Sequence, residues 1–234
     1  MVNTDLFWWA WMVNIDDPER ILALSYARAD RRPALAALFA LDDSLGQLVR
    51  TTREPALGQM RLAWWHERLE ALDSAPPPAE PVLEGLAREV LPRGVTGAAL
   101  ARVIEGWDVL IEEDQLDSEA LGRFARGRGG RLFVLAARAL GAPESEAVEA
   151  AGEGWALADL ALHLNDQVAA GEARALAAPL LNRATAARWP RAARALGALA
   201  HLARMDCALA PEAPRPIGAP RRVGRLLWHR LSGR

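Results

Sequence analysis

The chain has 234 residues, a hydrophobic fraction of 51%, a charged fraction of 25% and a formal net charge of −2. These values fit one large globular domain. Because the net charge is slightly negative, we expect no nucleic-acid partner. A single cysteine, Cys207, excludes an internal disulfide and a thiolate cluster for structural zinc. The longest stretch without a charged residue, 6–15, is far shorter than the roughly 20 residues of a membrane span. Because the N-terminus also does not resemble a signal peptide, we expect a cytoplasmic protein.

Helix-forming patterns dominate the first half of the chain. Residues 17–18 form an Asp-Pro pair that is typical of an N-cap followed by the first helical position. Pro33 and Pro55 each begin a longer segment in which large apolar residues recur at three- and four-residue spacing, as on one face of a helix. The triple proline at 76–78 predicts a loop, and a short helix is expected over residues 82–90.

The second half of the chain continues in the same way, and no run alternates apolar and polar residues as a strand would. Further helices are expected over residues 96–111, 118–140, 145–169, 190–209 and 223–231, with an irregular or short helical stretch over 170–188 and a loop over 211–220. We therefore predict an all-α fold in which residues 1–234 form a single-domain bundle of about eight to ten helices.

Two groups of acidic residues are candidates for chemistry. Asp42 and Asp43 lie on the second predicted helix, and Asp159 and Asp166 lie on the helix expected over residues 145–169. Inward carboxylates on facing helices of a bundle can bind Mg²⁺ and, through it, a diphosphate. The other interpretation of these acids is a polar face exposed to solvent.

The sequence Gly127-Arg128-Gly129-Gly130 lies inside the helical pattern of residues 118–140. Such a patch is flexible enough to wrap around a phosphate. Inside a helix, however, glycine also marks a kink or a place where two helices pack closely, and both interpretations are open.

Three segments resemble a known family. Residues 17–72 contain D-P-E-R-I-L-A-L, R-A-D-R-R-P-A-L-A-A-L-F-A-L and E-P-A-L-G-Q-M-R-L-A-W-W-H-E-R-L-E-A-L, and together with residues 120–142 and 154–158 they resemble the squalene/phytoene synthase family. The resemblance implies an isoprenoid synthase-like bundle, with a central cavity between the helices that begin near residues 33, 55, 118 and 145. It also implies a Mg²⁺-dependent reaction on prenyl diphosphates.

The aspartate motifs of that family have no match in this chain. The D-D-x-x-D motif falls on residues 46–50, which include Gly46 and Arg50, and the D-x-x-x-D motif falls within 162–168, where Asp166 is the only acid. Ionising a prenyl diphosphate in such a family needs about three Mg²⁺ ions, and an arginine in place of a ligand acid repels the metal. The resemblance thus implies a synthase fold without its catalysis, and we assign no catalytic residue, metal ligand or cofactor.

One branch of the family lacks these aspartates and resembles assembly factors of respiratory complex I; its M-R-L-x-W-W segment is similar to Met60–Trp65. The leading expectation is a non-catalytic protein that binds a partner protein or an isoprenoid-like lipid and serves respiratory complex assembly. Two alternatives stay open: an active Mg²⁺-dependent prenyl-diphosphate condensing transferase that uses displaced acids, and a lipid carrier. The residues expected to line the pocket are Asp42, Asp43, Gln47, Arg61, Trp65, Asp159, His163 and Asp166.

The C-terminal segment, residues 215–234, contains six arginines and no acid, so it is basic on an acidic body. This charge pattern predicts that the segment attaches peripherally to the inner face of a membrane or contacts a partner protein. The alternative is that the segment forms a helix that closes one end of the bundle. The expected surface residues are Arg221, Arg222, Arg225, Trp228 and Arg230, interleaved with Leu226, Leu227 and Leu231. Trp8, Trp9 and Trp11 predict a similar anchor or a segment packed over the bundle.

Overall fold

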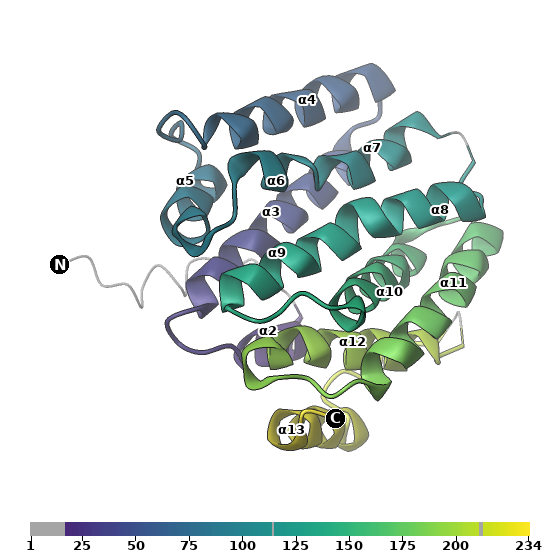
Figure 1. The fold of residues 1–234 in the computed structure, drawn as a ribbon. Helices are drawn as coiled ribbons and strands as arrows, with labels where there is room; N and C mark the ends of the chain where they lie inside the picture. Colours follow the sequence, from purple (N-terminus) through teal and green to yellow (C-terminus); the bar gives the residue numbers. More distant parts are fainter. Residues whose placement is uncertain (1–16, 114, 211–212) are drawn as a thin grey trace.

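The structure is a computed structural model, and it describes residues 17–113, 115–210 and 213–234. Every regular element in these ranges is a helix, and they contain no strand, which confirms the predicted all-α fold (Figure 1). Among the described residues, no helix combines the length and the hydrophobicity that crossing a membrane would require. Trp8, Trp9 and Trp11 lie outside the described residues.

The elements follow one another along the chain with short connections. Those of the first half are α2 (Pro18–Leu24), α3 (Arg32–Thr51), α4 (Pro55–Ala71), α5 (Pro81–Glu89), the 3₁₀ turn η1 (Leu91–Arg93), α6 (Gly97–Ala101) and α7 (Ile104–Glu112). Those of the second half are α8 (Ser118–Phe124), the π-helical segment η2 (Ala125–Gly130), α9 (Arg131–Leu140), α10 (Glu146–His163), α11 (Gln167–Ala186), the 3₁₀ turn η3 (Arg191–Ala193), α12 (Arg194–Cys207) and α13 (Pro220–Ser232). The predicted cap at residues 17–18 is confirmed, because the Asp17 carboxylate accepts hydrogen bonds from the backbone of Glu19 and Arg20.

The single helix expected over residues 145–169 is wrong. Helix α10 ends at His163, and the chain turns through residues 164–166 before α11 begins. The turn forms because Asp166 is the N-cap of α11, where its carboxylate accepts hydrogen bonds from the backbone N–H groups of Val168 and Ala169. Within the stretch 170–188, which was expected to be irregular or short helical, residues 170–186 form most of a 20-residue helix that contains Pro179.

Two smaller differences concern helix ends. The helix expected over residues 96–111 is divided into α6 and α7 by a turn at Arg102–Val103. The helix expected to be capped by Ser118 is capped one residue earlier, since the Asp117 carboxylate accepts a 2.8 Å hydrogen bond from the backbone of Ala120. Both differences move helix ends without changing which segments are helical.

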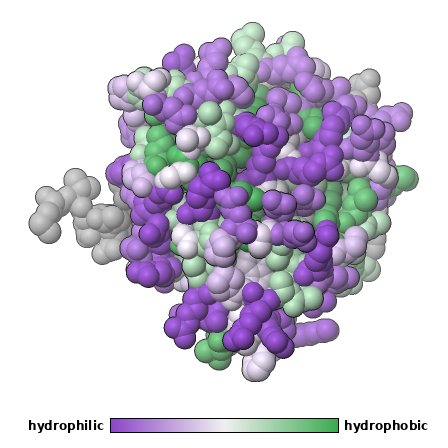
Figure 2. All heavy atoms as spheres, viewed as in Figure 1, coloured by the Kyte–Doolittle hydropathy of each residue, from purple (hydrophilic) through white to green (hydrophobic). Residues whose placement is uncertain are grey.

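Helix α10 occupies the centre of the bundle, where it packs against η2, α9, α11 and α12 (Figure 1). An aromatic cluster fills the space between α10 and its neighbours: Phe39 lies edge-on to Phe133 and Trp155, with ring centroids 6.2 and 5.6 Å apart. Helix α4 lies at one edge of the bundle and α13 at the opposite edge, packed on α12. The face seen in Figure 2 is largely hydrophilic, as expected for a bundle with its apolar residues inside.

The glycines of η2 mark close helix packing. A Cβ atom on Gly129 would lie 2.0 Å from the carbonyl oxygen of Gly152 on α10, and a Cβ atom on Gly106 of α7 would lie 2.2 Å from the backbone nitrogen of Arg128. Both distances are far inside van der Waals contact, so only glycine allows the backbones to approach this closely. The glycines thereby place η2 deep between α7 and α10.

Helix α13 has one buried face and one exposed face, so the predicted basic surface is partly wrong. Arg222 is only 4% exposed, because it points inward and donates hydrogen bonds to Glu19 and Asp206. Arg225 is partly buried and donates to His201 of α12. The remaining predicted surface residues are exposed: Arg221, Trp228 and Arg230. Among the interleaved leucines, Leu226 is buried, whereas Leu227 and Leu231 are exposed.

Candidate functional site

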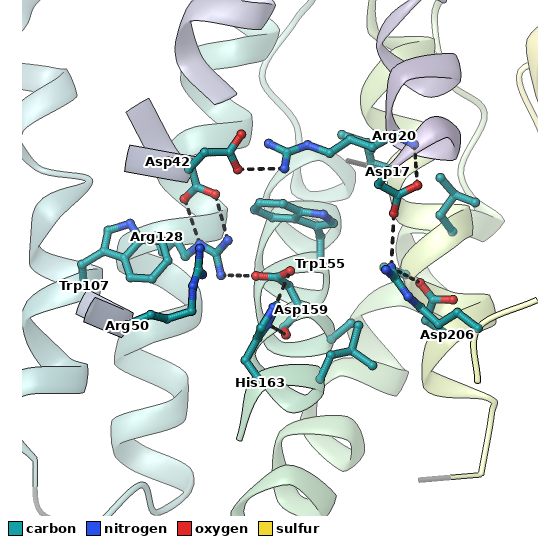
Figure 3. Close-up of a pocket in the computed structure, with 17 residues that line it drawn as sticks. Asp17, Arg20, Asp42, Arg50, Trp107, Arg128, Trp155, Asp159, His163 and Asp206 are labelled. Atoms are coloured by element: carbon teal, nitrogen blue, oxygen red, sulfur yellow. Dashed lines mark hydrogen bonds and ion pairs between the residues drawn. The ribbon is translucent and has the colours of Figure 1, made fainter. Parts of the chain in front are cut away.

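Arg128 lies at the centre of the candidate site, on the π-helical segment η2. Its side chain is 5% exposed, and its guanidinium joins two helices. Nε and Nη2 donate to the two carboxylate oxygens of Asp42 on α3, both at 2.8 Å, and Nη1 donates to Oδ2 of Asp159 on α10, also at 2.8 Å (Figure 3). A two-pronged contact of this kind is the strongest arrangement that an arginine and a carboxylate can form.

Aromatic rings enclose the same guanidinium. Its central carbon lies 4.3 Å from the ring centroid of Trp107, 4.7 Å from that of Trp155 and 5.6 Å from that of Phe124. The faces of these rings carry partial negative charge and attract the cation. The rings also exclude water, so the two carboxylates and the guanidinium interact in a poorly solvated environment.

The pKa directions agree with a fixed ion-pair network. Burial acts to lower the pKa of Arg128, but the charges of Asp42 and Asp159 outweigh it and hold that pKa above its ordinary value. Burial acts to raise the pKa of Asp159, but Arg128 and then His163 outweigh it and hold that pKa below its ordinary value. Arg128 and Asp159 therefore keep their charges throughout the neutral range.

A second arginine neutralises the neighbouring acid. Arg20 of α2 donates from Nη1 to Oδ1 of Asp43 at 2.8 Å, and its guanidinium carbon lies 4.8 Å from the centroid of Phe39. Burial raises the pKa of Asp43, although Arg20 acts in the opposite direction. Nε and Nη2 of Arg20 are buried and have no hydrogen-bond partner among the described residues.

These groups belong to the polar lining of a pocket of about 530 Å³ between α2, α3, α7, η2, α10 and α12 (Figure 3). Its apolar lining consists of Trp155, Ala158, Leu162, Leu199, Leu202 and Ala203. The rim is closed by further ion pairs, because Nη1 of Arg215 lies 3.2 Å from Asp17 and 3.9 Å from Asp206. The pocket thus combines charged side chains with apolar ones.

Arg50, in the last turn of α3, differs from the other arginines of the pocket. It lines the pocket, yet it makes no ion pair or side-chain hydrogen bond with any described residue. Every aspartate that lines the pocket is within ion-pair distance of another basic side chain. Arg50 is therefore the charge that the described part of the chain leaves available to a ligand.

The predicted pocket residues divide into three groups. Asp42, Asp43, Asp159 and His163 line the pocket. Gln47, Arg61 and Trp65 line a separate groove of about 360 Å³ between α3 and α4. Asp166 lines neither cavity, because it caps α11.

The predicted position of the cavity is accordingly wrong in one respect. Helix α4, which begins at Pro55, contributes no residue to the larger pocket, because it packs on the outside of α6 and α7. Helices α2, α7 and α12 contribute instead.

His163 follows Asp159 by one helical turn. Its Nδ1 lies 2.8 Å from the backbone oxygen of Asp159, and because a carbonyl oxygen can only accept, Nδ1 carries the proton. The imidazole is 46% exposed at the mouth of the pocket. His163 thus adds a polar edge beside Asp159.

Sequence reasoning missed most of the basic residues of the site. Arg128 was part of a recognised glycine-rich patch, but nothing in the spacing indicated that its side chain reaches two acids 86 and 31 residues away along the chain. No sequence pattern indicated Arg20 or Arg215 either. Arg20 reaches the site only because α2 packs there, and Arg215 only because the segment before α13 does.

The acids of the pocket do not fit a magnesium cluster. Asp42 and Asp159 are both bonded to Arg128, so the guanidinium occupies the space in which a metal would have to bridge them. Across residues 17–234, apart from 114, 211 and 212, no group of three or more His, Cys, Asp or Glu side chains is arranged to hold a metal ion.

Comparison with known proteins gives one finding. The family model described as Squalene/phytoene synthase matches residues 16–227, which is nearly the whole chain. No curated protein matches the chain.

Proposed function

The chain belongs to the squalene/phytoene synthase family, and from this premise we propose that it is a member without synthase activity whose pocket binds an isoprenoid-like lipid. The observation that supports the proposal most is the pairing of Arg128 with Asp42 and Asp159. The guanidinium of Arg128 lies between the two carboxylates, where a metal-dependent reaction would need room for a metal ion.

The energetic argument concerns what a metal would have to displace. Mg²⁺ could reach Asp42 only if Arg128 moved away, and leaving a buried charge without its partner costs about 3–5 kcal/mol. Departure of a diphosphate, by contrast, needs metal charge close to the leaving oxygens. Arg50 adds a further positive charge to the same pocket and disfavours a metal cluster there.

The shape of the pocket supports lipid binding. Its volume of about 530 Å³ lies within the range of small-molecule sites, and its apolar lining offers leucine, alanine and tryptophan side chains to a hydrocarbon chain. Arg50, which has no ion-pair partner among the described residues, would bind a polar or anionic head group. An amphiphile placed in this way would leave the ion pairs of Arg128 intact.

The catalytic part of the proposal is tested by turnover. The purified chain, given farnesyl or geranylgeranyl diphosphate and Mg²⁺, is expected to release no pyrophosphate above the buffer background. Steady release that requires Mg²⁺ and disappears in an Asp43→Ala variant would instead establish the alternative, an active prenyl-diphosphate condensing transferase.

The binding part is tested with geranylgeranyl diphosphate as the probe, by tryptophan fluorescence with Mg²⁺ and with EDTA. We expect the same Kd in both buffers, and a Kd roughly tenfold higher for Arg50→Gln, because a charged hydrogen bond is lost. Arg53→Gln is the matched control: Arg53 is exposed, lies three residues further on and does not line the pocket. Binding that requires Mg²⁺, or equal effects of the two variants, would contradict the proposal.

A role in respiratory complex assembly is supported by a different surface. The segment Met60–Trp65, which carries the resemblance to complex I assembly factors, lies on α4 with Met60 68% and Trp64 40% exposed. Together with Leu57 they form an outward apolar face that a partner protein could cover. In the source organism, loss of the chain should lower the amount of assembled complex I, and Met60→Glu should have the same effect. An unchanged amount would exclude this role.

A further inference from the structure

Helix α13 carries an apolar face that the rest of the described chain leaves uncovered. Leu227, Trp228 and Leu231 are 47%, 58% and 77% exposed. At about 100° per residue, Leu227 and Leu231 lie on one side of the helix, opposite the buried Arg222, Leu226 and His229. The helix is thus anchored to the body by one face and presents apolar side chains on the other.

The charged side chains that α13 itself carries around this face are all positive. Arg221 and Arg230 are exposed and flank the leucines on either side, and residues 215–234 contain no acidic side chain. The acids nearest to the helix, Glu19 and Asp206, are turned inward and bonded to Arg222. Figure 2 shows mainly hydrophilic atoms with a small hydrophobic group at the lower end of the molecule, where Figure 1 places α13.

This combination selects the kind of surface that the helix can bind. A second copy of the chain docked through α13 would bring two arginine-rich faces together, and like charges repel. An anionic membrane surface complements both features, because its phosphates attract arginine and its interface accepts Leu and Trp. The exposed apolar face of α4 lacks this complementarity, since Glu54, Glu67 and Glu70 accompany its arginines.

We propose that α13 is a membrane-docking helix that lies in the plane of an anionic leaflet, with Leu227, Trp228 and Leu231 in the interface and Arg221 and Arg230 at the phosphates. The proposal does not depend on what the pocket binds. It refines the basic surface predicted from the sequence, because Arg222 and Leu226 belong to the buried face and hold the helix in place.

The test is co-sedimentation of the full chain with phosphatidylcholine vesicles, with and without about 30 mol% phosphatidylglycerol, at low and high salt. We expect binding to the anionic vesicles at low salt, release at high salt, and little binding to phosphatidylcholine alone. Leu231→Glu should weaken binding at least tenfold, and Arg221→Gln roughly fivefold. Val168→Glu is the matched control, since Val168 is also apolar and 79% exposed but lies on α11.

Three outcomes would overturn the proposal. The first is no binding of the wild-type chain to anionic vesicles. The second is an equal loss of binding in Leu231→Glu and Val168→Glu at unchanged Tm, which would place the contact elsewhere. The third is a dimer that Leu231→Glu converts to a monomer while vesicle binding persists, which would show that a second copy covers the helix.

Discussion

A guanidinium that is almost completely buried must have negative charge beside it, and at Arg128 two carboxylates from different helices supply that charge. The same contact neutralises Asp42, which is only 1% exposed. Each partner is therefore the reason that the other can be buried. This mutual dependence makes Arg128 a structural residue as well as the residue that defines the pocket.

We expect Arg128→Gln to lower the free energy of unfolding by about 3–5 kcal/mol, because Asp42 would stay buried without a cation. Arg126→Gln, two residues earlier in the same π-helical segment but exposed, should change it by less than about 0.5 kcal/mol. Urea unfolding followed by circular dichroism measures both. The combination Arg128→Gln with Asp42→Asn should recover part of the loss, and no recovery would mean that the ion pair is not its source.

At the scale of single residues, the sequence predicted the acids better than the bases. Asp42, Asp43 and Asp159 were candidates for inward carboxylates, with a solvent-exposed face as the other interpretation, and all three line the pocket. Arg128 was not identified, since its role depends on how deeply the glycines allow η2 to sink. A contact between side chains 86 residues apart is a property of packing and leaves no local signal.

At the scale of elements, the decisive feature is the crossing of η2 with α7 and α10. Gly106 faces Gly127 and Arg128, and Gly129 faces Gly152, so three backbones approach with no side chain between them. The extra residue of a π-helical turn changes the direction in which the following side chains point, and such turns are frequent at functional sites. Here the turn contains Arg128 itself.

We expect Gly129→Ala to destabilise the protein by about 1–3 kcal/mol, because the new methyl group would lie 2.0 Å from the Gly152 carbonyl oxygen and force the helices apart. Gly171→Ala in α11 is the control: nothing lies within 4 Å of its added Cβ, so it should stabilise by about 0.5–1 kcal/mol through helix propensity. Thermal unfolding distinguishes the two, and equal Tm shifts would contradict the close-packing interpretation.

Proline and periodicity predicted most helices correctly, and the errors have physical causes. The starts near Pro18, Pro33 and Pro55 were found because proline favours the first helical turn. The break after His163 was missed because the apolar pattern continues through it, and only the cap at Asp166 marks the new start. Residues 170–188 were expected to be irregular or short helical, but burial of Ala173, Ala177 and Leu181 stabilises α11 despite Pro179.

At the scale of the whole molecule, α13 is held to α12 by two buried histidines. His201 and His229 have ring centroids 4.8 Å apart, and Arg225, Arg204 and Arg194 lie around them. Burial, followed by the charge of Arg225, lowers the pKa of His201 to about 3. Burial also lowers the pKa of His229 to about 4. Both imidazoles are therefore neutral in the folded protein.

This pair makes global stability depend on pH. In the unfolded chain a histidine binds a proton near pH 6.5, whereas in the folded chain it does so only near pH 3–4. The stabilisation is thus complete above pH 6.5 and is lost as the pH falls towards 4, by up to about 1.4 kcal/mol per pH unit for each histidine. Urea unfolding at several pH values should give this slope. His201→Gln should reduce it, because one of the two buried imidazoles is then lost.

The contact of Glu19 with Arg222 joins residues that are 203 positions apart. During synthesis Glu19 leaves the ribosome 203 residues before Arg222. Until Arg222 follows, Glu19 lacks the arginine that neutralises it, so its burial against α12 is unfavourable. The final position of α2 is therefore secured only once residue 222 has been made, and a chain that terminated before that residue would leave Glu19 without its partner.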